Sequence, residues 1–291
     1  AALGLYQWND DLSSVLFRTI SLVEVVLRNR FHNAMSLRYG VIGSHGSRDW
    51  YAHVHLGAHS RAKIMDITHV KKGQHMRPRK PVPSPDDVVS SLTFGFWPHL
   101  LDLKRDLNNN PLDWGVILLD VLPGHRQRQA DHWRKTNPRD ALFARLDLCN
   151  ELRNRIAHHE PIWKLGPLLS ESRPRSHVQR TIQAPAPTTP TDALARLQLL
   201  YGRVTELLVW LEPDVAAQHI SSETHLRCLN LLQPETLRAY QQALPFAEID
   251  LATLRNLRTL RKTLRYAARH KQPVLIKDGS RLIGLLTSAP P

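Results

Sequence analysis

The sequence predicts a mainly α-helical bundle that carries a small C-terminal extension made of one helix and a β-hairpin. Two observations indicate this fold class. Apolar residues recur at three- and four-residue spacing through much of the first 211 residues, which is typical of amphipathic helices. Near the C-terminus, two short apolar runs flank Asp278-Gly279, a typical hairpin turn. We therefore expect a helical domain over residues 1–211 and a basic helix-and-hairpin module over residues 212–291.

The first predicted helix is the longest and spans residues 10–39. Its apolar face repeats at helical spacing, with Leu12, Val15, Leu16, Ile20, Val23, Leu27 and Phe31. We expect Asp10 or Asp11 to cap its start, because a carboxylate accepts the free N–H groups there. Gly40 is expected to end it.

A basic and irregular segment is expected over residues 41–85, which closes with three prolines. Its cations include Lys63, Lys71, Lys72, Arg77, Arg79 and Lys80. Asp86 or Asp87 should then cap a shorter helix that runs through Phe96. The aromatic residues Phe94, Phe96 and Trp97 have apolar neighbours, so they are expected in the core rather than on a base-stacking surface.

Three further helices complete the predicted bundle. Residues 112–122 are apolar enough for a buried helix, and a longer helix is expected from Pro138 to His159. Residues 171–191 are rich in proline, serine and threonine, which indicates a linker or a long mobile loop. A leucine-rich helix should follow, from Thr191 or Asp192 to Leu211.

The predicted tail helix, residues 250–270, combines two stripes. One consists of leucines: Leu251, Leu254, Leu257, Leu260 and Leu264. The other is basic: Arg255, Arg258, Lys262, Arg265 and Arg269. A basic stripe can be no more than a solvated helix face. Because this one contains almost no acidic residues, we favour a surface that contacts phosphates, independent of sequence and sensitive to salt.

Charge and composition narrow the class of partner. The chain of 291 residues has 39 Lys and Arg against 26 Asp and Glu, a net charge of +13, and 16 histidines. This excess favours a nucleic-acid partner. The two cysteines are far apart and lack metal-ligand spacing, so we expect a cytoplasmic protein without a cofactor. The sequence has no long apolar run, so we expect no membrane span. The first residue is not Met, from which we expect that the true N-terminus is missing.

The most informative stretch is Leu152-Arg153-Asn154-Arg155-Ile156-Ala157-His158-His159-Glu160-Pro161, at the predicted end of a helix. Arginine can hold a phosphate bidentately, and histidine moves protons near neutral pH. RNA carries its own nucleophile, the 2′-hydroxyl, so these side chains could cleave it without a metal. A basic helix end also arises for purely structural reasons, since cations are favoured there. A metal site at His158 and His159 is disfavoured, because no carboxylate or cysteine lies at ligand spacing.

Helical geometry adds a constraint on this turn. Asn154 and His158 are four residues apart and should share one helix face, as should Arg155 and His159. Arg153 and His158 are five apart, so their directions diverge by roughly 140°. One chain therefore cannot easily close both side chains on one phosphate. Two copies related by a two-fold axis could do so, which predicts a homodimer with a composite active site.

Several ordered motifs resemble those of the Abi-like (abortive infection) branch of the HEPN superfamily, over about residues 1–211. They are Leu5-Tyr6-Gln7-Trp8-Asn9 with Leu12, Glu24-Val25-Val26-Leu27-Arg28-Asn29, Asp49-Trp50-Tyr51, Leu92-Thr93-Phe94-Gly95-Phe96-Trp97, and Leu152 to Trp163. The last motif resembles the Arg-x-x-x-x-His signature of that superfamily. The resemblance implies a HEPN-type all-α fold, a dimer and metal-independent endoribonuclease activity that leaves a 2′,3′-cyclic phosphate.

The resemblance also implies residue roles. Arg153 would hold the phosphate, Asn154 would assist, and His158 would be the catalytic histidine, with His159 as its rival. Many members are bacterial toxins or phage-defence effectors, so an antitoxin or a regulatory RNA is a further expected partner. Others have lost activity and only bind RNA, which is the alternative function for this chain.

Glu24 and Arg28 lie four residues apart on the first predicted helix, and both belong to the resembling motif. They could form an ordinary intrahelical ion pair. They could equally form a buried pair that orients Arg153 or His158 from the neighbouring helix.

Overall fold

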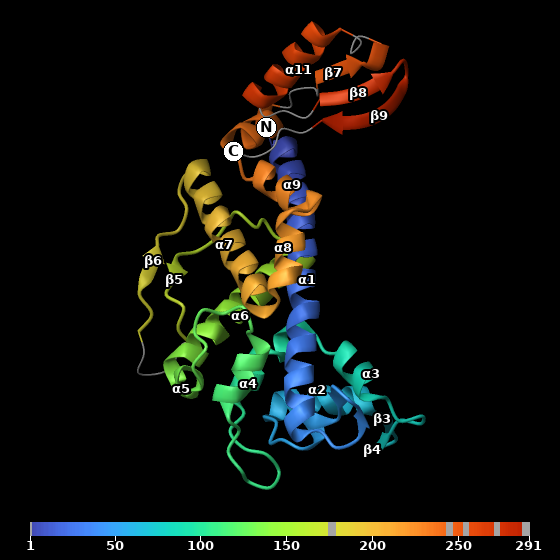
Figure 1. Ribbon diagram of the computed structural model, residues 1–291, viewed down its shortest axis with the longest axis vertical. Coiled ribbons are helices and arrows are strands. Elements are labelled where there is room, and N and C mark those ends of the chain that lie inside the picture. Colours follow the sequence, from blue (N-terminus) through green and yellow to red (C-terminus); the bar gives the residue numbers. More distant parts are fainter. Residues whose placement is uncertain (1, 174–178, 243–246, 253–255, 271–273, 287–291) are drawn as a thin grey trace.

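A long central helix organises the molecule, and the predicted mainly α-helical bundle is confirmed (Figure 1). The computed structural model describes the chain except residues 1, 174–178, 243–246, 253–255, 271–273 and 287–291. Helix α1 spans Ala2–Tyr39, about 57 Å at the usual rise per residue. Its predicted apolar face is buried from Trp8 to Met35.

The start of α1 differs from the prediction, whereas its end at Tyr39, before Gly40, agrees with it. The helix begins at Ala2, so neither Asp10 nor Asp11 is a cap. Asp11 instead forms an ion pair with Arg227 and accepts a hydrogen bond from the Tyr240 hydroxyl. Its carboxylate thus fastens two later helices to α1.

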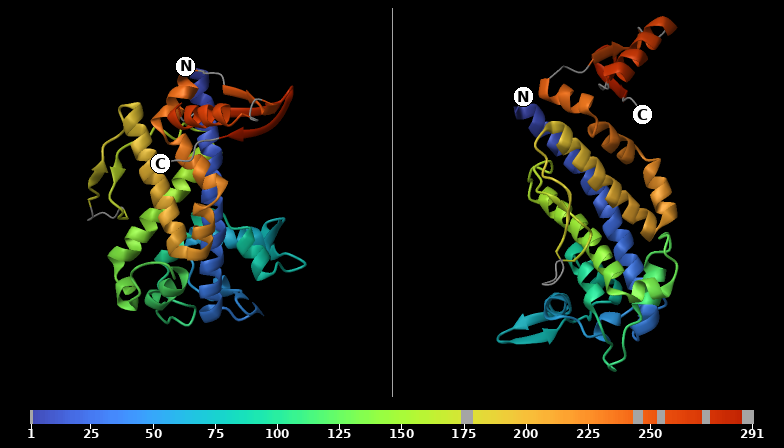
Figure 2. Two further views of the ribbon diagram at one scale, coloured as in Figure 1. Left: turned by 45° about the horizontal axis from the view of Figure 1, so that its top comes forward. Right: turned by 90° about the vertical axis from the view of Figure 1, so that its left-hand side faces the viewer.

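Five helices pack along α1 or beside it, and Figure 2 shows them aligned with the long axis of the molecule. They are α6 (Thr136–Ala157), α7 (Pro190–Leu211), α8 (Pro213–Ile220), α9 (Glu223–Leu231) and α10 (Pro234–Gln242). The short helices α4 (Trp114–Val121) and α5 (Ala130–Arg134) join them at one end. The predicted helices at 112–122, 138–159 and 191–211 correspond closely to α4, α6 and α7.

The helical core continues beyond residue 211, where the sequence predicts the domain to end. One cluster of buried residues includes Ala216, Cys228, Leu231 and Leu237 together with the α1 side chains. The indole N–H of Trp8 donates to the Leu231 carbonyl at 2.8 Å. Helices α8 to α10 therefore belong to the helical bundle, because their buried side chains share one core with those of α1.

The basic segment 41–85 is folded, contrary to the expectation of an irregular region. It contains two small antiparallel hairpins, β1 (Gly43–Ser44) with β2 (Ser47–Arg48) and β3 (His69–Lys72) with β4 (His75–Pro78). Between them lie the 3-10 helix η1 (Trp50–Ala52) and helix α2 (Ala58–Thr68). Few α2 side chains are buried, so its sequence lacks a clear apolar stripe.

The next helix is capped by Ser84, not by Asp86 or Asp87. Helix α3 (Pro85–Ser90) begins with a capping box, in which the Ser84 hydroxyl accepts the Asp87 N–H and the Asp87 carboxylate accepts the Ser84 N–H. It ends before Phe96, and two 3-10 helices follow, η2 (Phe94–Phe96) and η3 (Pro98–Asp102). The aromatic side chains of this segment lie in the core, as predicted.

The described residues of the proline-rich segment 171–191 contact the bundle through helix α7. Its described residues include β6 (Ile182–Ala184), which pairs with β5 (Leu168–Leu169). The buried guanidinium of Arg196 on α7 donates to the Ala184 and Pro185 carbonyls at 2.9 and 2.6 Å. Helix α7 then starts in a capping box at Thr189. Because α7 and the helices after it share the core of α1, this segment is a loop within the bundle and not a linker between domains.

The C-terminal module has a separate small core of Ile249, Ala267 and Val274. The predicted hairpin is present as β8 (Val274–Asp278) and β9 (Arg281–Leu286), with Gly279 at a φ of +56° in its turn. A strand that the sequence analysis missed, β7 (Ala247–Asp250), pairs in parallel with β8.

Helix α11 (Leu257–His270) crosses between β7 and β8 and is shorter than the predicted 250–270. The predicted leucine stripe is not its buried face. Leu251, Leu257 and Leu264 are exposed, and Leu254 lies outside the described residues. Across the described part of the chain, no helix has the length and apolarity to cross a bilayer.

Candidate active site

The predicted catalytic residues lie on the last turn of α6 and just after it. The helix ends at Ala157, and the N–H of His158 still donates to the carbonyl four residues back at 3.0 Å. The N–H groups of His159 and Glu160 donate to the carbonyls three and five residues back, at 3.0 and 2.9 Å. This pattern is the Schellman motif, which satisfies the last carbonyls of a helix.

His159 takes the left-handed position of this motif, with a φ of +54°. Glycine is the usual residue at that position, because a Cβ there costs about 1–2 kcal/mol. Such local strain is concentrated at functional sites, where the surrounding structure enforces it. The strained backbone turns the His159 side chain away from the helix direction.

Arg155 holds the turn in place. Its Nη2 donates to the carbonyls of Pro161 and Lys164 at 2.8 and 2.9 Å, and the Glu160 carboxylate lies 3.6 Å away. The predicted pairing of Arg155 with His159 on one helix face is not formed, since His159 has left the helix. Arg155 is therefore a positioning residue for the segment after the turn.

A second anchor comes from α1. The side-chain carbonyl of Asn9 accepts the N–H of Ile162 at 3.0 Å, and the Ile162 side chain is fully buried. Sequence reasoning missed this role, although Asn9 follows Trp8 in the opening motif. The turn is thus fixed between α1 and the end of α6.

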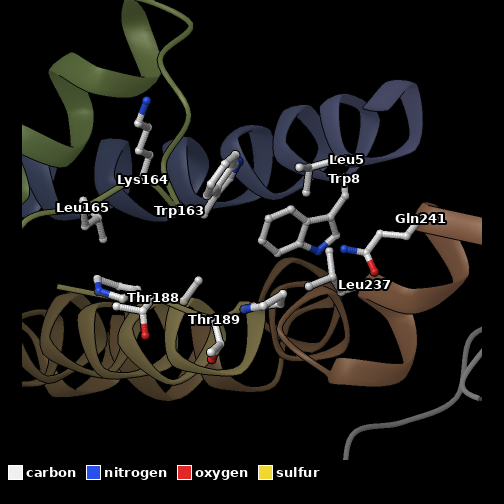
Figure 3. A pocket seen from close by; sticks show the side chains of 12 residues that line it. Leu5, Trp8, Trp163, Lys164, Leu165, Thr188, Thr189, Leu237 and Gln241 are labelled. Atoms are coloured by element: carbon white, nitrogen blue, oxygen red, sulfur yellow. The ribbon is translucent and has the colours of Figure 1, made fainter. Parts of the chain in front are cut away.

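An apolar pocket of about 210 Å³ lies directly behind this segment (Figure 3). Trp163 and Lys164 line it on one side, opposite Thr188 and Thr189 at the start of α7. The α1 and α10 helices supply the remaining walls, Leu5, Trp8, Leu237 and Gln241. The chain that follows the turn is therefore packed among three helices.

The four candidate side chains differ in exposure. Asn154, His158 and His159 are exposed, whereas Arg153 is half-buried. Arg153 Nη1 lies 3.4 Å from Asn154 Oδ1, and its Nε is buried without a partner. Within the described residues, neither histidine ring has a hydrogen-bond partner. The surface of this helix end is therefore open, with a partly buried cation beside it.

Glu24 and Arg28 do not form the ion pair that their spacing allows. Arg28 donates from Nη1 to the Ser90 carbonyl at 3.3 Å, and both residues are half-buried. Among the described residues, no hydrogen bond or ion pair joins either of them to Arg153 or His158.

The predicted RNA-contacting cations lie on two separate elements. Lys71 and Lys72 are exposed on the β3–β4 hairpin. The tail cations Arg258, Lys262, Arg265 and Arg269 are exposed on α11, whereas Arg255 lies outside the described residues. The hairpin and α11 are at opposite ends of the molecule in Figure 1 and in the right-hand view of Figure 2. They are two distinct basic surfaces.

Other nucleophiles are poorly suited to catalysis. Cys149 and Cys228 are both fully buried, and burial raises the pKa of each thiol to about 12. Among the described residues, no three His, Cys, Asp or Glu side chains are arranged to hold a metal ion.

The chain belongs to the Abi-like family. Residues 1–164, more than half of the chain, match the family model described as Abi-like protein. The match covers α1 and ends just after the turn that follows α6. No curated protein and no solved structure matches the chain.

Proposed function

We propose that this protein is a metal-independent endoribonuclease of the HEPN kind that acts in abortive infection, as a toxin or a phage-defence effector. The family membership supports a role in phage defence. The chemistry is inferred from the end of α6, where two exposed imidazoles follow a half-buried arginine with an unpaired Nε. An orphaned buried donor of this kind suggests an absent partner, such as a phosphate oxygen. Arg155 Nε is also unpaired, so the support comes from the whole set of side chains.

The proposed reaction uses the 2′-hydroxyl of RNA as the nucleophile. One imidazole removes the hydroxyl proton while the 2′-oxygen attacks the adjacent phosphorus. The bond from phosphorus to the 5′-oxygen breaks, and that oxygen receives a proton from an imidazolium. Arg153 stabilises the charge on the phosphoryl oxygens, and Asn154 offers a further hydrogen bond. The products are a 2′,3′-cyclic phosphate and a 5′-hydroxyl.

The geometry of one helix end favours a homodimer as the active form. Arg153 and His158 diverge by roughly 140° around the α6 axis. If two chains meet at this surface, the arginine of one can face the histidine of the other across a two-fold axis. An antitoxin protein or a regulatory RNA that covers the surface would keep the enzyme silent.

Substrate RNA would be held mainly through its phosphates. The exposed cations of the β3–β4 hairpin and of α11 lie on two separate surfaces. Because they would contact phosphates rather than base edges, we expect binding that is independent of sequence. Binding should weaken steeply as salt rises, because each neutralised phosphate releases a counterion.

The second candidate function is non-catalytic RNA binding. It is favoured by one observation, namely that neither His158 nor His159 is oriented by a hydrogen bond within the described part of a single chain. An imidazole without an orienting partner is a weaker general base than one held in a fixed tautomer.

A cleavage assay on generic RNA separates these functions. The wild-type protein should cut RNA in EDTA and leave cyclic-phosphate ends. Arg153→Ala and His158→Ala should each abolish cutting, whereas His45→Ala, an exposed histidine on the β1–β2 hairpin, should not. RNA binding without cutting would support the alternative. A complete requirement for a divalent ion would refute the mechanism.

A further inference from the structure

The apolar pocket behind the segment that follows α6 has walls suited to a flat aromatic ligand. The indole rings of Trp8 and Trp163 line it (Figure 3), together with the side chains of Leu5, Leu165 and Leu237. An apolar cavity of about 150 Å³ is large enough to hold benzene, so the volume of about 210 Å³ suits a larger ring system. Aromatic side chains bind nucleic-acid bases by stacking, because every base has a π-face.

Gln241 on α10 brings an unpaired polar group to this pocket. The residue is half-buried, and its amide is turned toward the Trp8 ring (Figure 3). Within the described residues, neither the oxygen nor the nitrogen of this amide forms a hydrogen bond. An amide carries an acceptor oxygen beside a donor NH₂ group. A ligand in the pocket is therefore offered one donor and one acceptor side by side.

Other polar groups of the pocket already have partners. The Thr188 hydroxyl donates to the Asp192 carboxylate at 3.0 Å, and the Thr189 hydroxyl accepts the Asp192 N–H at 3.1 Å. Both hydroxyls thus take part in capping α7. The indole N–H of Trp8 donates to the Leu231 carbonyl. The pocket therefore combines mainly apolar walls with the free amide of Gln241.

We propose that this pocket binds an adenine base. Adenine presents an amino donor next to a ring-nitrogen acceptor, which is the complement of a glutamine amide. Among the four bases of RNA, adenine alone has a single exocyclic polar group. Guanine, cytosine and uracil each have two, and the second would remain unpaired against apolar walls, which is unfavourable. Adenine therefore fits this pocket better than the other three bases.

The pocket is close to the turn that carries the candidate catalytic residues. Trp163 follows His159 by four residues, so their Cα atoms are at most about 14 Å apart. Arg155 connects the two regions, because its Nη2 donates to the Lys164 carbonyl at 2.9 Å. The Lys164 side chain is exposed and extends away from Thr188 (Figure 3), and its ammonium forms no ion pair with any described residue. This cation is available to the phosphate of a nucleotide whose base fills the pocket.

Two sources could supply the adenine, namely a free adenine nucleotide and an adenosine within an RNA strand. In the second case the pocket would select a base near the cleaved phosphate, and this part of the inference rests on the proposed function. Binding of the base does not rest on it, because no catalytic step is needed to fill the pocket.

Calorimetric titration of the full chain provides the test. The free probes are AMP, GMP, CMP and UMP. The RNA probes are 2′-O-methyl uridine hexamers with adenosine, guanosine or uridine at the third position, which lack a free 2′-hydroxyl and so report binding without cleavage. In the set that contains the ligand, the adenine probe should bind about ten-fold more tightly than the others, the discrimination expected of one bidentate pair.

Three substitutions on α10 locate the binding site. Gln241→Ala removes the amide and should weaken adenine binding about ten-fold. Gln241→Glu presents only acceptors, so the preference should move toward guanine, whose adjacent N–H donors match a carboxylate. Gln242→Ala is the matched control, because it removes an exposed amide from the next position of the same helix, and it should change the affinity by less than about two-fold. No hydrogen bond to either side chain joins the described residues, so these variants should keep the fold.

The outcomes separate the two sources and expose the proposal to refutation. AMP binding at least as tight as that of the adenosine hexamer identifies a free nucleotide as the ligand. Tighter binding of the adenosine hexamer identifies an adenosine in RNA. Either result stands even if the protein cuts no RNA, because the probes are not cleaved. Equal binding of all bases, absence of binding, or an equal effect of Gln241→Ala and Gln242→Ala overturns the proposal.

Discussion

Replacing His159 with glycine should stabilise the protein. The residue has a φ of +54°, where an L-amino acid costs about 1–2 kcal/mol. Glycine adopts this conformation freely. Its greater conformational entropy in the unfolded chain, however, destabilises the folded state by about 0.4–1 kcal/mol. We expect a net gain of about 0.5–1 kcal/mol in the free energy of unfolding. The corresponding rise in Tm is about 2 °C.

His158→Gly is the matched control, because it removes the same side chain from the neighbouring position. His158 has a φ of −94°, which any residue adopts, so glycine there should cost about 0.5–1 kcal/mol. Thermal and urea unfolding of both variants measure the change in the free energy of unfolding, which should be a gain for His159→Gly and a loss for His158→Gly. A His159→Gly variant that is no more stable than His158→Gly would refute the assigned turn. An RNA-cleavage assay on the two glycine variants also separates the candidate histidines. Only replacement of the catalytic histidine should abolish activity.

Three further predictions concern the scaffold. Arg155→Ala removes both hydrogen bonds to the carbonyls that hold the turn, so the free energy of unfolding in urea should fall by about 2 kcal/mol. The segment after α6 should also be cleaved faster by proteases. Unchanged proteolysis would contradict the positioning role of Arg155. Arg145→Met leaves the exposed Glu206 without this partner and Glu171 with Arg203 alone, so it should cost about 1–2 kcal/mol. An unchanged urea midpoint would refute the importance of that network. Burial lowers the pKa of His219 and of His225, whose rings both contact the Tyr201 hydroxyl, and the folded state therefore favours their neutral forms. The unfolded chain then binds more protons than the folded protein below about pH 6.5, so Tm should fall as the pH is lowered from 7 to 5. His219→Gln should make this decrease of Tm smaller, and an equal decrease in the variant would contradict the assignment.

The long helices could be predicted from the sequence because their cores are continuous. The predicted core positions of α1 between Leu12 and Phe31 follow helical spacing, and all of these positions are buried. Helix α7 has a similar stripe. The start of α1 could not be predicted, because Asp11 looks like a cap in isolation and only the Arg227 and Tyr240 contacts reveal its role.

Elements that depend on distant partners were missed. Helix α2 buries little, so its sequence shows no strong period. Strand β7 becomes a strand through pairing with β8, which follows it only after an intervening helix. Helices α8 to α10 were assigned to the tail because nothing in their sequence shows that they cover α1.

For the candidate site, the sequence was informative about residue types and less so about roles. Asn154 and His158 remain aligned because His158 still completes the last helical bond. The spacing of Arg155 and His159 was misleading, since the Schellman turn removes His159 from the helix. The anchors from Arg155 and Asn9 depend on the path of the chain after Pro161, which helical spacing does not describe.

Mixing two inactive variants tests the composite ribonuclease site most directly. Arg153→Ala and His158→Ala protomers, combined and allowed to exchange, form a heterodimer in which one of the two sites has both residues. If the arginine of one chain faces the histidine of the other, RNA cleavage should return to about a quarter of the wild-type rate. If the mixture remains as inactive as each variant alone, although the chains demonstrably exchange, the composite site is wrong.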